Sequence, residues 1–245
     1  MQVRLDKFLA DAGIGTRSEV KNIIKKKAVT VNGVIAAKPE MKVYTEADEV
    51  AVNGKSVANR GKVTYMLHKP AGYVCALTDD RFPTVMELVP KEKDLFPVGR
   101  LDKDTEGLLL ITNDGEMSHR MLSPRSHVYK MYMAVLEEPA ENEYVNQFLD
   151  GVDIGDDKPT LPAKLVICDD KSPELEYLPE EYMACAEQAR VVLLTIHEGR
   201  YHQVKRMFHA VGNEVIYLKR LTFGKVTLPL SLEKGEVVIC DPILT

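Results

Sequence analysis

Residues 99–110 read GRLDKDTEGLLL, and they form the most informative stretch of the chain. The apolar run after Gly107 predicts a buried strand over residues 107–112. Three acids, Asp102, Asp104 and Glu106, precede it in a loop that brings them to the edge of a sheet. The glycines on either side of the loop allow its backbone to approach a ligand closely. The stretch is therefore a candidate functional site.

Two interpretations of this loop stay open from its composition. Paired carboxylates are the acid and base of glycoside hydrolases, which would make two of the three acids essential. Alternatively, the acids pair with Arg100 and Lys103 in a solvated loop that carries no chemistry.

A second candidate segment covers residues 198–207, EGRYHQVKRM. A glycine turn opens a helix predicted over residues 203–211, with apolar side chains at helical spacing and Lys205, Arg206 and His209 on the exposed face. A helix start and a basic face both suit phosphate, although a solvated amphipathic helix has the same pattern. His202 and His209 have no acidic ligands nearby, so we expect no metal site. No phosphate-cradling glycine loop is present, so we expect no nucleotide cofactor.

The first 60 residues have a different pattern. Leu5 to Ala12 has helical spacing, and Thr16-Arg17-Ser18-Glu19 is a capping box that opens a second helix. Asn32-Gly33 and Asn53-Gly54 are hairpin signals that follow β-branched runs. Residues 55–62 are polar and predict a linker, so we place a domain boundary near residue 60. Residues 61–245 alternate strands with a few helices, which predicts an α+β domain.

Composition limits the class of protein. The chain has 245 residues, of which 45% are hydrophobic and 28% charged, as in a soluble globular protein. Its apolar runs are too short to span a bilayer, and its N-terminus does not resemble a signal peptide. The four cysteines are widely spaced, which argues against a disulfide framework or a structural zinc site. We therefore expect a cytoplasmic protein.

The net charge of −5 hides an uneven distribution. Residues 1–45 carry nine Lys/Arg against four acids, and residues 199–225 carry six against one. Fourteen acids fall between Glu137 and Glu181. The sequence thus predicts two basic surfaces on an acidic body, as in a protein that binds a polyanion.

Residues 99–110 strongly resemble the catalytic motif of the ribosomal RNA pseudouridine synthases. Three further stretches agree with that family in order and spacing: residues 68–72 (HKPAG), residues 130–132 (KMY) and residues 199–208 (GRYHQVKRMF). Residues 1–60 are similar to an S4 RNA-binding domain. Tyr201, His202 and Phe208 look most like the small-subunit branch of the family.

The resemblance implies a fold of two parts. A small S4-like RNA-binding domain over residues 1–60 would precede a catalytic domain over residues 61–245, built on a mixed or antiparallel sheet. It also implies an isomerase that turns one uridine of ribosomal RNA into pseudouridine, without cofactor or metal. Small-subunit (16S) RNA would be the substrate, either free or inside a partly assembled particle.

The resemblance further implies which residues act. Asp102 would be the nucleophile on a flipped-out uridine, attacking ribose C1′ or uracil C6 or assisting a glycal route. Tyr132 would stack on the uracil, and Lys205 would be the basic partner that keeps Asp102 ionised. Ile196 would lie beneath the uracil, and Asp104 and Glu106 would serve loop structure. The remaining substrate-binding residues would be Arg100, Arg200, Gln203 and Arg206, with phosphate contacts from Arg4, Lys7, Arg17, Lys21 and Lys25.

Three alternatives remain. Within the same activity, the substrate could be 23S RNA of the large subunit. The fold could also serve a non-catalytic RNA-binding assembly factor, although the trio of Asp102, Tyr132 and Lys205 favours catalysis. A glycoside hydrolase would need Asp104 or Glu106 as a second essential carboxylate.

Overall fold

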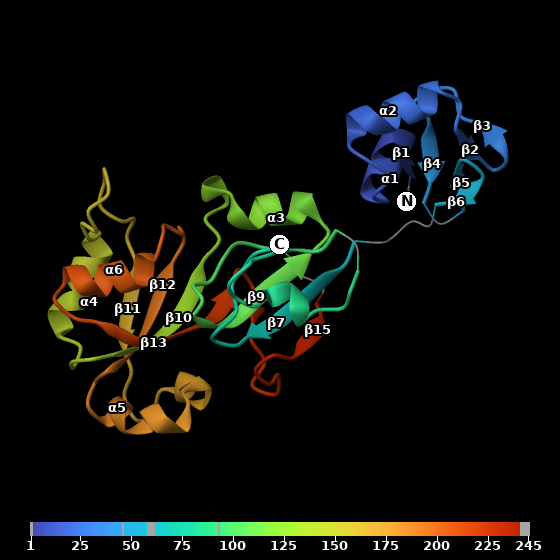
Figure 1. Ribbon diagram of the computed structural model, residues 1–245. Helices are drawn as coiled ribbons and strands as arrows, with labels where there is room; N and C mark the ends of the chain where they lie inside the picture. The colour runs from blue at the N-terminus through green and yellow to red at the C-terminus, as the bar shows by residue number, and fades with distance from the viewer. Residues whose placement is uncertain (1, 46, 58–61, 93, 241–245) are drawn as a thin grey trace. The chain divides into compact units, whose positions relative to one another are not determined.

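The computed structural model describes residues 2–45, 47–57, 62–92 and 94–240 (Figure 1). The chain divides into two compact units, Met1–Lys62 and Val63–Thr245. None of the helices in the described ranges is long and apolar enough to cross a membrane.

The first unit packs two helices on short strands. Its elements are β1 (Gln2–Arg4), α1 (Leu5–Asp11), α2 (Arg17–Lys25), β2 (Val29–Val31), β3 (Val34–Ile35), β4 (Lys42–Tyr44), β5 (Val50–Val52) and β6 (Lys55–Ser56). The predicted capping box is present, because the Thr16 hydroxyl accepts from the Glu19 amide while the Glu19 carboxylate accepts from the Thr16 amide. Both predicted hairpins form, β2–β3 around Asn32-Gly33 and β5–β6 around Asn53-Gly54.

The linker prediction is wrong at its start. Lys55 and Ser56 form β6 and pair with β5, because a hairpin ladder is made by backbone groups and needs no apolar side chain. The boundary that we placed near residue 60 falls among residues 58–61, which lie outside the described residues.

The second unit is built on a mixed sheet, which confirms the predicted fold class. Its strands are β7 (Thr64–Lys69), β8 (Phe96–Pro97), β9 (Glu106–Thr112), β10 (Lys130–Leu136), β11 (Lys164–Ile167), β12 (Val191–Ile196), β13 (Val215–Phe223), β14 (Val226–Thr227) and β15 (Val237–Ile239). The order in the described sheet is β11-β12-β10-β13-β9-β7-β15, with β8 and β14 pairing to β9 and β13. The pairing of β9 with β13 is parallel, and the other pairings recorded for this sheet are antiparallel.

Helices cover both faces of this sheet. The helical segments are η1 (Val85–Glu87), α3 (Gly115–Leu122), η2 (Pro124–Ser126), α4 (Asn142–Asp150), η3 (Pro173–Tyr177), η4 (Glu180–Tyr182), α5 (Met183–Glu187) and α6 (Gln203–Ala210). Phe148 of α4 and Phe208 of α6 pack together over one face, in a core that includes Tyr132 and Leu218. Met121 of α3 and Ala186 of α5 belong to smaller cores on the opposite face.

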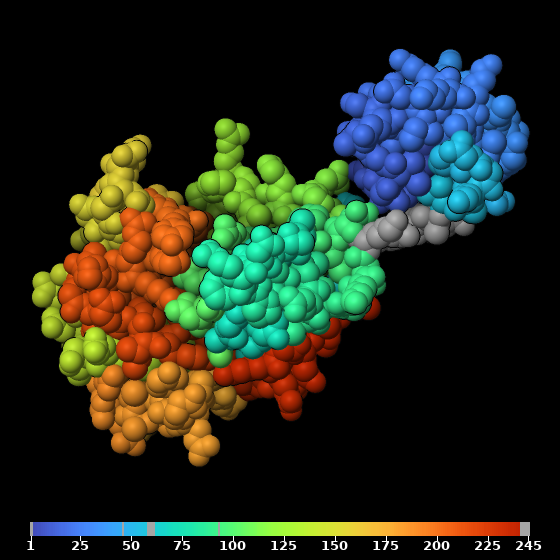
Figure 2. All heavy atoms as spheres, in the orientation of Figure 1, coloured from blue at the N-terminus to red at the C-terminus, as the bar shows by residue number. Residues whose placement is uncertain are grey.

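Segments far apart in the sequence meet beside β9. On the molecular surface, the segment that follows β7 lies next to the region of α6 (Figure 2). The loop 99–105 runs into β9 at this place, and Lys205 of α6 reaches its Asp104. The sheet therefore brings both candidate segments of the sequence to one position.

Candidate active site

A cavity of about 90 Å³ opens between the loop 99–105 and the start of α6. It collects side chains from the loop, from β10 and β12, from α6 and from β13. The lining residues are Arg100, Leu101, Asp102, Thr105, Tyr132, Ile196, Gly199, Arg200, His202, Gln203, Val204, Lys205 and Leu218. Seven of the residues expected to act on the substrate thus line one cavity: Asp102, Tyr132, Lys205, Arg100, Ile196, Arg200 and Gln203.

Asp102 lies at the mouth of this cavity with two basic neighbours. Its side chain is 26% exposed, so both solvent and a ligand can reach the carboxylate. The Nε2 atom of His202 lies 3.4 Å from Asp102 Oδ1, and the Nζ atom of Lys205 lies 3.9 Å from Asp102 Oδ2.

Lys205 contacts Asp104 more closely than Asp102. Its Nζ donates to both Asp104 carboxylate oxygens, at 2.7 and 2.6 Å. Burial opposes the ionisation of Asp104, yet the Lys205 ammonium holds the pKa of that carboxyl below its usual value. Lys205 therefore bridges two carboxylates of the same loop, where we expected Asp102 to be its partner.

Part of the cavity lining is apolar, and it comes from three strands of the sheet. Tyr132 of β10, 8% exposed, pairs with Leu194 on one side and with Arg220 on the other. Ile196 ends β12, and Leu218 comes from β13. A flat ring and two aliphatic side chains suit a planar base, which stacks on aromatic surfaces.

Residues 68–72, the HKPAG motif of the resemblance, anchor the loop 99–105 through hydrogen bonds to its backbone. The fully buried Lys69 donates its ammonium hydrogens to three carbonyl oxygens, those of Pro70, Lys103 and Thr105. The Gly72 amide donates to the Lys103 carbonyl as well. Burial lowers the pKa of Lys69. This anchoring was not predicted, because an exposed lysine gives the same sequence signal as a buried one.

The ion pairs of the loop acids differ from the pairing considered from composition. Asp104 pairs with Lys205, and Glu106 pairs with Lys234, where Arg100 and Lys103 were the expected partners. Of the three acids, Asp102 lines this cavity, whereas Asp104 and Glu106 do not.

The basic segment 199–225 is not the open surface that its charge predicts. Lys219 and Arg220 are buried. Arg200 binds the carbonyl oxygens of Lys158 and Pro159. Arg206, which is not among the cavity lining, binds Asp156 and the Ile154 carbonyl. A loop from the acidic part of the chain thus neutralises this face.

Gln203, which lines the cavity, also has hydrogen-bond partners within the protein. It is buried, accepts from the Arg200 amide and donates to Glu198, so it shapes the turn that opens α6.

The basic residues of the first unit divide into two groups. Arg4 makes a paired contact with the buried Asp6, at 3.0 and 2.9 Å, and lowers the pKa of that carboxyl. Arg17, Lys21 and Lys25 are exposed on α2, whereas Lys7 is half-buried on α1. Arg4 thus has a structural partner, and α2 carries the exposed charge.

Six lining residues were not among those expected to act on the substrate: Leu101, Thr105, Gly199, His202, Val204 and Leu218. The Thr105 hydroxyl is buried and has no hydrogen-bond partner in the described part of the chain. Leu218 had no signal in the sequence beyond its place in a strand. His202 was considered as a metal ligand and as a mark of the small-subunit branch, but not as a neighbour of Asp102. No group of three or more His, Cys, Asp or Glu residues in the described ranges is placed to hold a metal ion.

Comparisons with known proteins agree with this geometry. Residues 63–210 match the RNA pseudouridylate synthase family, and residues 3–50 match the S4 domain. A crystal structure of a pseudouridylate synthase is similar, with a TM-score of 0.64 and 38% identity, covering 98% of this chain and 96% of that one.

Two relatives span nearly the whole chain. The RNA pseudouridine synthase YtzG of Bacillus subtilis, described as uncharacterised, is 43% identical over 96% of this chain and 93% of its own length. The ribosomal small subunit pseudouridine synthase A of Escherichia coli K12 is 41% identical over 96% of this chain and 94% of its own. With the family matched over the catalytic unit and identity above 40% across the chain, this protein belongs to the RNA pseudouridine synthases that carry an S4 domain, and it is an isomerase.

Proposed function

We propose that this enzyme converts one uridine of small-subunit (16S) ribosomal RNA into pseudouridine in the cytoplasm, with Asp102 as the nucleophile. The observation that carries the proposal is the meeting of Asp102, Tyr132 and Lys205 at one cavity. The identity to proteins named ribosomal small subunit pseudouridine synthase A, 40% for that of Pasteurella multocida, supports the choice of RNA.

The reaction needs no external electron or group donor. The bond from ribose C1′ to uracil N1 breaks, the uracil turns over, and C1′ bonds to C5. The proton lost from C5 is balanced by the proton gained at N1. Because a base inside a helix cannot turn over, the uridine must leave its stack and enter a pocket.

Each residue has a role that its position supports. The carboxylate of Asp102 can trap or stabilise an electron-poor ribose or uracil carbon and then leave again. Tyr132 presents a ring to the flipped uracil, with Ile196 and Leu218 as the apolar walls. Lys205 balances the charge of Asp102, and Arg100, exposed at the rim, contacts the RNA backbone.

The exposed basic face of the first unit binds the phosphates of the RNA. Arg17, Lys21 and Lys25 lie on one helix, and contacts to phosphates made by such residues depend on salt but little on sequence. Selection of the uridine then depends on the shape of the folded RNA, presented as free RNA or within a partly assembled small subunit.

Pseudouridine mapping tests the proposal. Small-subunit RNA, free and in partly assembled particles, is incubated with the enzyme, and carbodiimide adducts are located by primer extension. We expect one new stop with the wild type, none with Asp102→Asn, and the stop retained with Asp170→Asn. Asp170 is an exposed acid outside the cavity, so this variant is the matched control for the loss of charge.

Other outcomes point to the alternatives. A stop in large-subunit RNA only would keep the isomerase and contradict the proposed substrate. Isomerisation of uridine by folded Asp102→Asn protein would contradict the role of Asp102 as the nucleophile. RNA binding without any stop would favour an assembly factor. Asp104→Asn should retain more than about a tenth of the activity, because an exposed ion pair contributes roughly 1 kcal/mol or less.

A further inference from the structure

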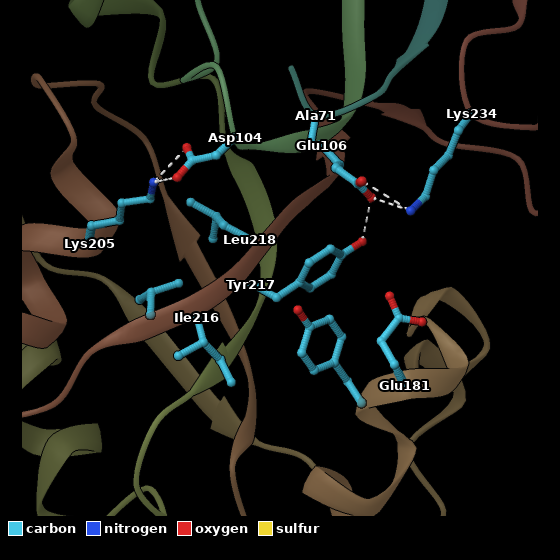
Figure 3. Close-up of a pocket in the computed structure, with 11 residues that line it drawn as sticks. Ala71, Asp104, Glu106, Glu181, Lys205, Ile216, Tyr217, Leu218 and Lys234 are labelled. Atoms are coloured by element: carbon cyan, nitrogen blue, oxygen red, sulfur yellow. Dashed lines mark hydrogen bonds and ion pairs between the residues drawn. The ribbon is translucent and has the colours of Figure 1, made fainter. Parts of the chain in front are cut away.

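A second cavity lies on the other side of Lys205. It measures about 230 Å³ and is lined by Ala71, Asp104, Glu106, Glu181, Tyr182, Lys205, Val215, Ile216, Tyr217, Leu218 and Lys234. Figure 3 shows the Asp104–Lys205 pair and the Glu106–Lys234 pair on opposite sides of it, with Tyr217 pointing to Glu106. Glu181 faces them from a separate segment.

This cavity adjoins the active site. Lys205 and Leu218 line both cavities, so a single layer of side chains separates them. The Lys205 ammonium lies 3.9 Å from Oδ2 of Asp102, which lines the first cavity, and 2.6 Å from Oδ2 of Asp104, which lines the second. When a uridine occupies the first cavity, the second is therefore within reach of the next nucleotide of the same strand.

The charges of the lining disfavour a phosphate. Three acids, Asp104, Glu106 and Glu181, outnumber the two lysines. Both lysines are already paired, Lys205 with Asp104 and Lys234 with Glu106 at 2.9 Å. The part of a nucleotide that enters this cavity is therefore its neutral base.

Two side chains of the lining remain available to a ligand: the Glu181 carboxylate, which can accept hydrogen bonds, and the aromatic ring of Tyr182. The Glu181 side chain is exposed and makes no hydrogen bond or ion pair with another described residue. Tyr182 packs against Tyr217, with 5.1 Å between ring centroids, and is half-buried. Tyr217 donates its hydroxyl hydrogen to Glu106 at 2.8 Å, and burial together with Glu106 raises its pKa, so it stays a neutral phenol.

We propose that this second cavity binds the base next to the target uridine, and that it selects a base with an amino group: guanine, adenine or cytosine. The Glu181 carboxylate accepts hydrogen bonds from the amino group, as carboxylates do from base edges. Tyr182 supplies an aromatic surface for stacking. Uracil has no amino group, and its single edge donor, N3–H, lies between two carbonyl oxygens that a carboxylate repels.

The test rests on the proposed function and uses the full-length enzyme. An RNA fragment that contains the mapped uridine is prepared with the amino group of each flanking base removed in turn, as inosine for guanosine, purine riboside for adenosine or zebularine for cytidine. The enzymes are the wild type, Glu181→Ala and the matched control Glu180→Ala, an exposed acid of the same short helix η4 that does not line the cavity. The measured quantity is kcat/KM.

We expect removal of one flanking amino group to lower kcat/KM of the wild type about tenfold. Glu181→Ala should cause a similar loss on unmodified RNA and no further loss on the RNA without that amino group. Glu180→Ala should behave as the wild type on both. The non-additivity isolates the contact between Glu181 and the base.

Two results would overturn this inference and leave the proposed function intact. One is a kcat/KM that does not change when the amino group of either flanking base is removed. The other is a combined loss in kcat/KM equal to the product of the separate losses from the RNA change and from Glu181→Ala. The inference would also be overturned if the mapped uridine had uracil on both sides, because neither neighbour would then carry an amino group. An enzyme that isomerises no ribosomal RNA would overturn the proposed function and this inference with it.

Discussion

At the scale of single residues, the half-buried Lys130 begins β10 and carries an ammonium group. Its Nζ donates to the Glu198 carbonyl at 3.3 Å, and the nearby Arg220 adds a second positive charge. Burial, and then Arg220, lower the pKa of Lys130 from 10.5 to about 8. The pKa of Lys130 is therefore higher in the unfolded chain than in the folded protein. Below pH 8, where Lys130 is charged in both states, this difference lowers the free energy of unfolding.

Replacing Lys130 should therefore have a pH-dependent effect on stability. Lys130→Met should raise the free energy of unfolding at pH 7, and its advantage over the wild type should shrink as the pH rises from about 8 to 10.5. Urea unfolding across this range measures the difference. Lys164→Met, at an exposed position of β11, controls for the loss of one lysine. An advantage that stays constant with pH would contradict the prediction.

Residue identity could be predicted where a motif marks it, and not where only three-dimensional packing does. The motifs led to Asp102 and Tyr132, which share a cavity as expected. Leu218 had no such mark, because many aliphatic residues occupy strands and only the sheet order places this one beside β10. The contact of Lys205 with Asp104 was missed for a similar reason, since spacing does not tell which of two neighbouring carboxylates an ammonium will reach.

At the scale of elements, the parallel contact between β9 and β13 depends on Gly107. Its φ is +101°, and a Cβ built there would lie 2.2 Å from the Arg220 carbonyl oxygen. Only glycine allows β13 to come this close to the end of the loop that contains Asp102. The register pairs Gly107 with Arg220 and Glu106 with Lys219.

A methyl group at this position should be poorly tolerated. Gly107→Ala should lower the free energy of unfolding by about 3 kcal/mol, from backbone strain and steric overlap. Gly115→Ala is the control, because its Cβ meets nothing within 4 Å and it lies at the start of α3. That variant should be neutral or more stable by up to about 1 kcal/mol. Equal stability of Gly107→Ala and wild type in urea would refute the steric argument.

Elements with local signals were predicted well. The α2 capping box and the β2–β3 hairpin depend on neighbouring residues, and each forms as expected. The sheet order was not predicted, because β13 lies between β10 and β9 through contacts between distant segments.

At the scale of the whole molecule, the first unit should set the salt dependence of RNA binding. Removing residues 1–60 should weaken binding to long RNA and reduce the slope of log K against log salt by roughly 0.7–0.9 for each phosphate that the protein no longer neutralises. Filter-binding titrations at several salt concentrations give the slope. The full-length variant Arg17→Ala/Lys21→Ala/Lys25→Ala should reproduce part of the change without deletion. A slope unchanged in both would show that the basic face of α2 does not touch RNA.

The division into units was suggested by charge and turn signals, but the charge was a poor guide to surface. The segment 199–225 has as large an excess of positive charge as the N-terminal segment, yet its Arg220 is 2% exposed and its Arg206 is held by Asp156. Sequence counts charges along the chain, whereas a phosphate meets only those that folding leaves uncovered.

The β9–β13 pairing also has a consequence for synthesis on the ribosome. The loop with Asp102 emerges early, but the strand against which it is braced emerges only after residue 215. At ~5–20 residues per second, the interval is on the order of ten seconds. During that time the nascent chain already contains its first unit, complete by residue 62, but no finished reaction centre. On the proposed function, each new molecule would thus be able to bind RNA before it could modify it.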